Sequence, residues 1–221
     1  METTFPYEIP DREIYRYLGY RNTLPDEAVL GKIALCKERL IKDVSPKAIW
    51  QYYDITWQDD TTFLLEGIPV RSQNLSRNIA DCHRICLLAV TLGPAPDRYI
   101  PKAEVTAMSD AVIYQAISAA MIEAYCNHIN GLIRKEAEEE GYFLRPRFSP
   151  GYGDFPLEFQ RNIGDLLQMA KNIGLTLTDS LLMMPSKSVT AVIGCSQTDS
   201  NCKEAGCEVC NKSATCAFRR I

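Results

Sequence analysis

The sequence predicts an α+β fold in which long helices pack on one mostly antiparallel sheet. Residues 109–140 are rich in Ala, Ile and Glu and end at Gly141, which is typical of one long helix with a glycine stop. Aromatic and β-branched residues fill 48–55 and 61–65, on either side of a polar turn, which predicts a β-hairpin. Residues 189–193 predict a further core strand. Helices and strands in this irregular order favour an α+β arrangement.

Shorter helices are expected on both sides of the hairpin. Asp11 is a candidate cap for a first helix that Gly19 ends, and a second helix follows Pro25 and ends before Pro46 with one apolar face. The stripe Leu75, Ile79, Cys82, Cys86 and Ala89 also has helical spacing, and it grades into a strand at residues 87–92. A further helix is expected from Pro156 to Gly174.

The composition favours one compact domain followed by a C-terminal segment rich in cysteine. A chain of 221 residues with 46% hydrophobic content can bury one sizeable core, so we expect one domain at residues 1–198 and a Cys-rich tail at 199–221. The net charge of −4 argues against a nucleic-acid partner. No run of 18 apolar residues and no signal-peptide pattern is present, which predicts no membrane association and a cytoplasmic location.

The segment Arg147-Phe148-Ser149-Pro150-Gly151-Tyr152 has the character of a ligand-binding loop. Pro150 restricts φ and Gly151 permits close approach of the main chain to a small molecule. The guanidinium of Arg147 can bind a carboxylate through two parallel hydrogen bonds. The alternative is an ordinary surface turn in which Arg147 is solvated and Tyr152 covers the core.

The segments that follow this loop strengthen the ligand-binding interpretation. Gly153-Asp154-Phe155-Pro156 comes first, then Thr178-Asp179-Ser180, then the stretch from Met183 to Gly194. Together with residues 16–21 and 90–93, this order resembles the reactivation domain of cobalamin-dependent methionine synthase and its free-standing relatives. The resemblance spans most of residues 10–200. It implies the activation-domain fold and a reactivation subunit that acts in trans.

The resemblance also implies a ligand and its binding residues. S-adenosylmethionine would be held by Glu123, Arg147, Ser149, Pro150 and Gly151, and Tyr152 would project toward the corrin face. Its carboxylate needs an arginine, and its ammonium and sulfonium groups need acidic or carbonyl neighbours. By position alone, Glu123 could equally lie at the edge of an apolar helix face and reach water.

The partners implied by the resemblance carry the remaining chemistry. Cobalamin oxidised to the cob(II) state would sit on a separate methionine synthase subunit or another corrinoid protein, with a flavodoxin or ferredoxin as electron donor. Two departures from the family pattern stand out. Pro156-Leu157-Glu158 contains no histidine, and Asn201-Cys202 follows the second Asp-Ser where the family has a Tyr-Phe pair.

The tail contains the pattern C-x4-C-x2-C-x5-C, formed by Cys202, Cys207, Cys210 and Cys216. Four thiols so close together in a cytosolic chain are typical of a metal site, either an iron-sulfur cluster or zinc. Two alternative functions follow: an iron-sulfur electron-transfer protein that activates another corrinoid methyltransferase, or a zinc-stabilised scaffold. The cysteines expected to be buried small hydrophobes are Cys36, Cys82, Cys86 and Cys126.

One further motif resembles a cobalt-binding signature only in part, and we do not predict a cobalt site from it. The segment Asp81-Cys82-His83 begins like a cobalt-binding signature, but Cys86 replaces its glycine. Because these residues fall on the predicted helical stripe, we interpret His83 as a histidine on a helix surface.

Overall fold

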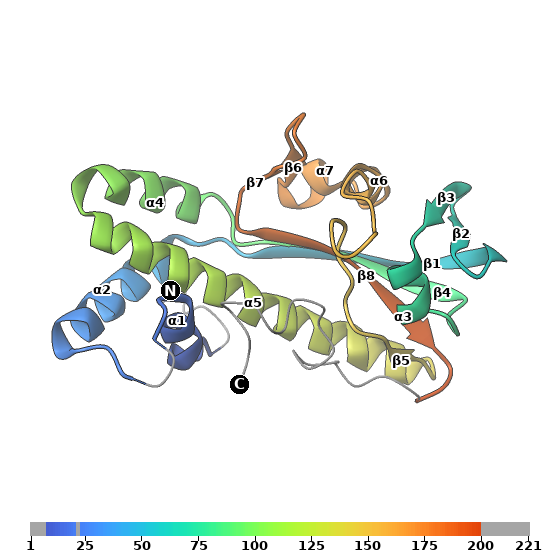
Figure 1. The fold of residues 1–221 in the computed structure, drawn as a ribbon, viewed down its shortest axis with the longest axis horizontal. Coiled ribbons are helices and arrows are strands. Elements are labelled where there is room, and N and C mark those ends of the chain that lie inside the picture. The colour runs from blue at the N-terminus through green and yellow to red at the C-terminus, as the bar shows by residue number, and fades with distance from the viewer. Residues whose placement is uncertain (1–7, 21–22, 200–221) are drawn as a thin grey trace. The chain divides into compact units, whose positions relative to one another are not determined.

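The computed structural model describes residues 8–20 and 23–199, and it confirms the α+β class (Figure 1). The chain divides into two compact units, and the expected division into a domain at residues 1–198 and a tail at 199–221 stays a prediction. The first contains Met1–Ala48, Val90–Ile129 and Ile173–Ser188, and the second contains Ile49–Ala89, Asn130–Asn172 and Val189–Ile221. The predicted long helix is present as α5 (Met108–Glu139), and Gly141 follows it with a φ of 79°.

The first unit is mainly helical. Its elements are α1 (Asp11–Tyr17), α2 (Glu27–Asp43), α4 (Ala95–Thr106), the first part of α5 and the hairpin β6 (Thr176–Leu177) with β7 (Met183–Met184). Asp26 caps α2 by accepting a hydrogen bond from the Val29 N–H at 2.8 Å. The predicted cap at Asp11 is wrong, because Pro10 holds the cap position and Asp11 is already helical. The predicted apolar face of α2 is confirmed, with Ile33, Cys36 and Leu40 all buried.

A six-stranded sheet dominates the second unit. Its strands are β1 (Lys47–Asp59), β2 (Thr62–Leu65), β3 (Ile68–Arg71), β4 (Arg84–Thr91), β5 (Phe143–Leu144) and β8 (Ser188–Ser196), in the order β3-β2-β1-β4-β8-β5. The pairings β1–β2, β2–β3 and β5–β8 are antiparallel. The predicted hairpin is confirmed, with Trp57 opposite Phe63 and their rings edge-on at 5.3 Å.

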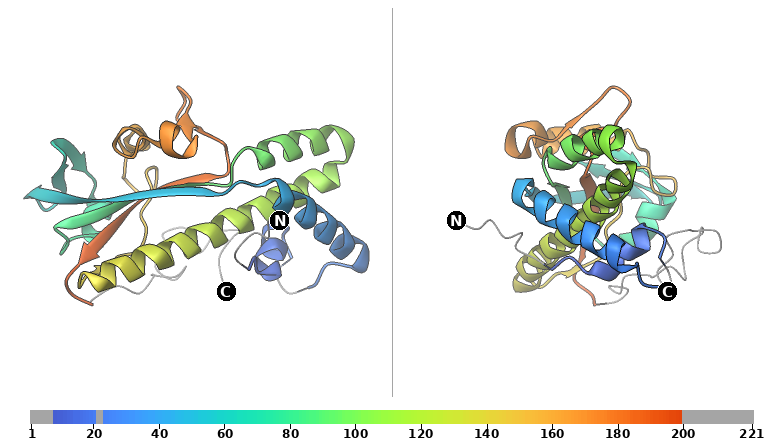
Figure 2. Two further views of the ribbon diagram at one scale, coloured as in Figure 1. Left: turned by 180° about the vertical axis from the view of Figure 1, so that it is seen from behind. Right: turned by 90° about the vertical axis from the view of Figure 1, so that its left-hand side faces the viewer.

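Helices of the second unit cover both faces of this sheet (Figures 1 and 2). Neighbouring residues of β1 show the alternation directly: the Tyr52 hydroxyl donates to the Ile133 carbonyl on α5, and the Tyr53 hydroxyl donates to the Leu166 carbonyl on α6 (Phe159–Leu166). Burial on both faces explains why nearly every residue of β4 and β8 is buried.

Two helices are shorter in the structure than the sequence predicted. The stripe from Leu75 to Ala89 is not one helix: α3 (Gln73–Asn78) ends early, and Cys86 and Ala89 lie in β4. His83 is exposed in a bend rather than on a helix. The helix expected from Pro156 to Gly174 is split into α6 and α7 (Met169–Ile173), because Gln168 between them has a φ of 47°.

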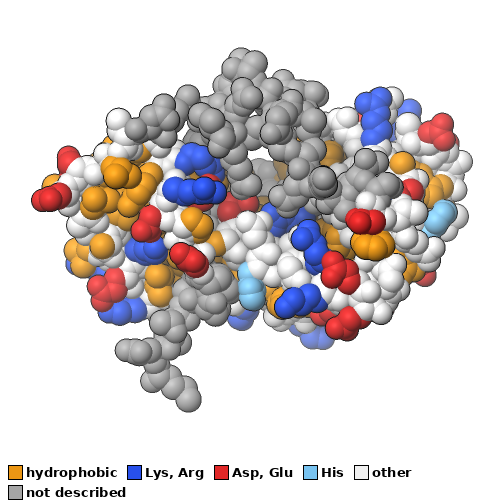
Figure 3. Space-filling view, turned by 90° about the horizontal axis from the view of Figure 1, so that it is seen from below, with side chains coloured by type: hydrophobic (Ala, Val, Ile, Leu, Met, Phe, Trp, Pro, Cys, Tyr) orange, Lys and Arg blue, Asp and Glu red, His pale blue; other side chains and the backbone are white. Residues whose placement is uncertain are grey.

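Among the residues that the structure describes, none of the helices is both long and apolar enough to cross a bilayer. The face in Figure 3 carries positive and negative side chains intermixed over its described part.

Candidate functional site

The candidate loop lies in the second unit and runs beside β8. Leu144 of β5 pairs with Cys195, the Arg145 N–H donates to the Gly194 carbonyl at 2.8 Å, and Phe148 forms an antiparallel bridge with Val192. Both hydrogen bonds of that bridge are short, at 2.8 and 2.9 Å. The segment that leads to Arg147 is therefore held along a buried core strand.

The Pro-Gly turn has the defined backbone conformation that the sequence predicts. Pro150 is buried, and Gly151 adopts a φ of 84°, a conformation that favours glycine. The Gly151 N–H donates to the Phe155 carbonyl at 2.8 Å, and the Tyr152 N–H donates to the Ser149 carbonyl at 3.1 Å. A Cβ added at Gly151 would lie 3.1 Å from Cδ1 of Leu157, so the turn also packs closely on the chain that follows.

Aromatic rings of the loop and of the residues that follow it pack against one another. Phe155 and Phe159 are buried with ring centroids 5.2 Å apart, and Phe148 lies 6.2 Å from Phe155. Tyr152 contacts Phe148 edge-on at 5.7 Å but keeps 60% of its surface exposed. An exposed ring on a rigid base matches the expectation that Tyr152 projects outward.

Asp154 ties the end of the loop to the first turn of α3. Its carboxylate accepts hydrogen bonds from the Ser72 hydroxyl at 2.6 Å, the Gln73 N–H at 2.7 Å and the Asn74 N–H at 3.0 Å. The hydrogen bond from Ser72 and those from the two backbone amides lower the pKa of Asp154. No role of Asp154 was predicted from the sequence.

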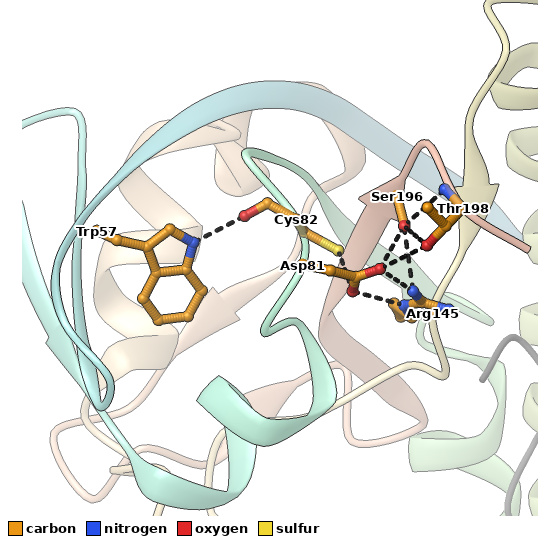
Figure 4. Close-up of polar contacts among 6 residues, drawn as sticks. All are labelled: Trp57, Asp81, Cys82, Arg145, Ser196 and Thr198. Carbon is orange, nitrogen blue, oxygen red and sulfur yellow. Dashed lines mark hydrogen bonds and ion pairs between the residues drawn. The ribbon is translucent and has the colours of Figure 1, made fainter. Parts of the chain in front are cut away.

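Arg145 anchors the beginning of the loop through a polar cluster (Figure 4). Its side chain is only 2% exposed and forms a two-point ion pair with Asp81, with Nε donating to Oδ1 at 3.1 Å. The hydroxyls of Ser196 and Thr198 donate to the same carboxylate at 2.6 and 2.9 Å, and Arg145 Nη2 donates to Ser196 Oγ at 3.1 Å. A buried guanidinium with this many partners satisfies the requirement for burying a charge.

The lowered pKa of Asp81 predicts that its carboxylate stabilises the folded protein less at acid pH. Partial burial raises its pKa, but hydrogen bonds from Ser196, Arg145 and Thr198 together lower it to about 2, below the ordinary value of about 3.9. Because the folded pKa is the lower one, the stabilisation is fully present above about pH 4 and is lost as the pH falls toward 2.

We therefore expect the stability difference between wild type and Asp81→Asn to shrink as the pH falls from about 4 to about 2. The pH-dependent part should be on the order of 1 kcal/mol, because the carboxylate is 41% exposed and solvent screens it. Urea unfolding at a series of pH values measures this difference. Parallel pH profiles for the two proteins would contradict the assignment.

The other predicted binding residue, Glu123, lies half-buried on α5 in the first unit, whereas Arg147 lies half-buried in the second. Their joint action on one ligand stays a prediction. Residues 183–188 of the later motif stretch belong to the first unit, where the Ser186 N–H donates to Asp97 on α4 and Lys187 Nζ donates to Gln115 on α5 at 2.7 Å. Residues 189–194 of the same stretch belong to the second unit.

Comparison with known protein families decides the identity of the fold. Residues 75–206, more than half of the chain, match the model of the vitamin B12 dependent methionine synthase activation domain. The chain belongs to this family. The matched range contains Glu123, the loop of residues 145–154 and the stretch from Thr178 to Gly194, so the resemblance seen in these motifs is confirmed at the level of the family.

A solved structure shows the same fold. The crystal structure of the MetH reactivation domain bound to AdoHcy is similar with a TM-score of 0.63 and 17% sequence identity, over 91% of this chain and 81% of that chain. The likeness confirms the activation-domain fold, including the mostly antiparallel sheet and the long helix. No curated protein matches this activation domain.

The cysteines divide into two groups. Cys36, Cys82, Cys86 and Cys126 of this activation domain are buried, as predicted, and Cys195 is buried as well. Burial raises the pKa of Cys82 and of Cys195 to about 12, so these thiols stay protonated. Within residues 8–20 and 23–199, no cluster of His, Cys, Asp or Glu could hold a metal. The predicted ligands Cys202, Cys207, Cys210 and Cys216 lie outside the described residues, and their role stays a prediction.

Proposed function

We propose that this activation domain binds S-adenosylmethionine and supports the reductive remethylation of cob(II)alamin on a separate corrinoid protein. The observation that carries the proposal is the loop of residues 145–154: within an activation-domain fold, it presents Arg147 beside a buried Pro150 and a positive-φ Gly151. The MetH reactivation domain of the same fold was crystallised with AdoHcy, which supports a ligand of this type.

The residues present suit the chemistry of this ligand. The guanidinium of Arg147 would bind the carboxylate, and Glu123 would lie near the ammonium or sulfonium group. Ser149, Pro150 and Gly151 would offer backbone groups to the adenine. Because Gly151 has no Cβ and already adopts a φ of 84°, the main chain there can come close to a ring without rearranging.

The partner would contribute the reacting centre. Cobalamin on a separate subunit would take up one electron, from a donor such as flavodoxin or ferredoxin, and the methyl group, and S-adenosylhomocysteine would be released. The role of this chain in that step is to orient the methyl donor and to shield the encounter from water.

Binding and turnover test the proposal separately. Calorimetry should show that the purified chain binds S-adenosylmethionine. In a mixture with a corrinoid protein in the cob(II) state, a reductant and S-adenosylmethionine, the absorption of methylcobalamin should appear only when the chain is present. Absence of binding would sink the proposal, and binding without methylation would limit the chain to carrying the ligand.

Tyr152 is expected to act in the encounter with cobalamin rather than in binding the methyl donor, because its ring is 60% exposed on a rigid base. Tyr152→Ala should slow methylation of the corrinoid partner by roughly an order of magnitude and leave the affinity for S-adenosylmethionine largely intact. Tyr152→Phe keeps the ring and serves as the matched control. The reverse pattern, with affinity lost and methylation rate per bound ligand kept, would move Tyr152 into the methyl-donor pocket.

The four-cysteine spacing of the tail supports a second candidate function. An iron-sulfur protein could activate another corrinoid methyltransferase by electron transfer alone, with no methyl donor bound. A zinc site would instead leave the chain as a stabilised scaffold. Binding of S-adenosylmethionine separates the first proposal from both alternatives, and metal analysis separates the two alternatives from each other.

A further inference from the structure

One short segment, residues 72–82, holds both ends of the candidate loop. This segment and the loop are far apart in the chain: Asp81 and Arg145 are separated by 64 positions, and Ser72 and Asp154 by 82 positions. Both belong to the second unit. We call residues 72–82 the clamp segment.

At the far end of the loop, the clamp segment binds Asp154 through three donors. The Ser72 hydroxyl and the N–H groups of Gln73 and Asn74 all donate to its carboxylate, at 2.6 to 3.0 Å. Ser72 Oγ also accepts a hydrogen bond from the Leu75 N–H at 3.1 Å, so the same serine caps α3 and holds the loop. Charge-assisted hydrogen bonds of this length are the stronger kind.

Close packing supports this end. Gly153 has a φ of 58°, and a Cβ placed there would overlap the side chain of Asn74. The loop backbone therefore comes too near α3 for any larger residue at this position. The loop is therefore held to α3 by close packing as well as by the hydrogen bonds to Asp154.

At the near end, the clamp segment binds Arg145 through Asp81 (Figure 4). The clamp is itself fixed to the sheet, because the Trp57 indole N–H on β1 donates to the Cys82 carbonyl at 2.8 Å. A Cβ at Gly194 of β8 would lie 2.8 Å from both Cys82 Sγ and Ile79 Cγ2, which shows how tightly residues 79–82 pack on that strand. Arg145 is thus anchored to a rigid part of the unit.

Arg147 and the Pro150-Gly151 turn lie between these two anchors. A loop fixed at both ends loses less conformational freedom when it binds a ligand, so more of the contact energy appears as affinity. We propose that Asp81 and Asp154 are positioning residues, which hold the loop so that Arg147 meets the ligand carboxylate in the right geometry. This inference rests on the proposed binding of S-adenosylmethionine.

Asp154 provides the cleaner test, because its carboxylate lies on the surface and its loss leaves no buried charge. Asp154→Ala should weaken binding of S-adenosylmethionine by roughly five- to tenfold, the cost of ordering part of a loop on binding, and Asp154→Asn should recover part of this loss. Asp26→Asn, which changes the carboxylate that caps α2 in the first unit, is the matched control and should bind like wild type.

If Asp154 had a purely structural role, its loss would lower the stability of the protein, and its effect on binding would not depend on Arg147. The double variant Arg147→Ala/Asp154→Ala should instead lose clearly less affinity than the sum of the two single losses, because part of what Asp154 positions is Arg147. Amide hydrogen exchange of residues 147–152 in the ligand-free protein should be faster in Asp154→Ala and in Asp81→Asn than in Asp26→Asn.

The outcomes separate the two proposals. If wild type does not bind S-adenosylmethionine by calorimetry, the proposed function fails and the positioning role fails with it. If wild type binds and the folded Asp154→Ala variant binds equally tightly, the positioning role alone is overturned. Additive losses in the double variant would also overturn it. Should Asp81→Asn fail to fold, the Asp154 variants decide the question without it.

Discussion

Arg147→Ala is expected to weaken the binding of S-adenosylmethionine by on the order of 1.5–3 kcal/mol, the usual loss for a hydrogen bond to a charged group. The residue lies half-buried on a loop that is bridged to β8 at Phe148 and fixed at Arg145 and Asp154. A guanidinium on so fixed a base can meet a carboxylate with two parallel hydrogen bonds. Calorimetry on the purified chain measures the effect.

Two further variants make the result specific. Arg147→Lys keeps the charge but removes the planar fork, so it should recover only part of the affinity. Arg98→Ala removes an exposed arginine of α4 and should bind like wild type. Glu123→Gln should weaken binding by a smaller step than Arg147→Ala. If Arg147→Ala binds as tightly as wild type, the carboxylate contact belongs to another residue.

The sequence predicted the class of fold because its strongest signals are local. The glycine stop at Gly141, the prolines at positions 25 and 46 that bound α2, and the aromatic and β-branched residues of β1 are each signals that lie within a few positions of the element they define. The errors arose where local signals were ambiguous. A strand buried on both faces has an unbroken run of apolar residues, so the spacing of Cys86 and Ala89 in β4 could be taken for that of a helix.

The break between α6 and α7 had no sequence signal that could have shown it. Gln168 adopts a φ of 47° although glutamine does not favour that conformation, and neither Gly nor Pro is present there. The Asn172 side chain donates to the Leu167 carbonyl at 2.8 Å, which satisfies a backbone group at the break. The Tyr53 hydroxyl on β1 also donates to the Leu166 carbonyl at 3.1 Å, so a contact from a distant part of the chain is made at the end of α6.

The conformation of the candidate loop was predicted at its centre, whereas the contacts that hold its two ends were missed. The Pro-Gly turn and the exposed ring of Tyr152 follow from their own residue types. The anchors Asp81 and Arg145 are 64 residues apart, and no periodicity links them. Asp81 was visible in a motif that began like a cobalt-binding signature, but only the fold shows that its carboxylate meets an arginine instead.

The Cys-rich tail carries the other prediction with a large expected effect. Cys202, Cys207, Cys210 and Cys216 should bind one metal centre, most readily an iron-sulfur cluster that passes an electron toward the corrin. Four thiolates between residues 202 and 216 lose little chain entropy when they close around a metal. Left without a metal, they would be closely spaced thiols prone to oxidation.

Anaerobically reconstituted protein should therefore show broad visible absorption that bleaches with dithionite, and the double variant Cys207→Ser/Cys210→Ser should lose it completely. Cys36→Ala is the matched control, because Cys36 is a buried thiol of α2 in the first unit and should leave the absorption unchanged. A colourless protein with one tightly held zinc would sink the electron-transfer role and keep the ligand assignment. In that case the electron must come from a separate donor, because zinc bound by four thiolates does not change its oxidation state.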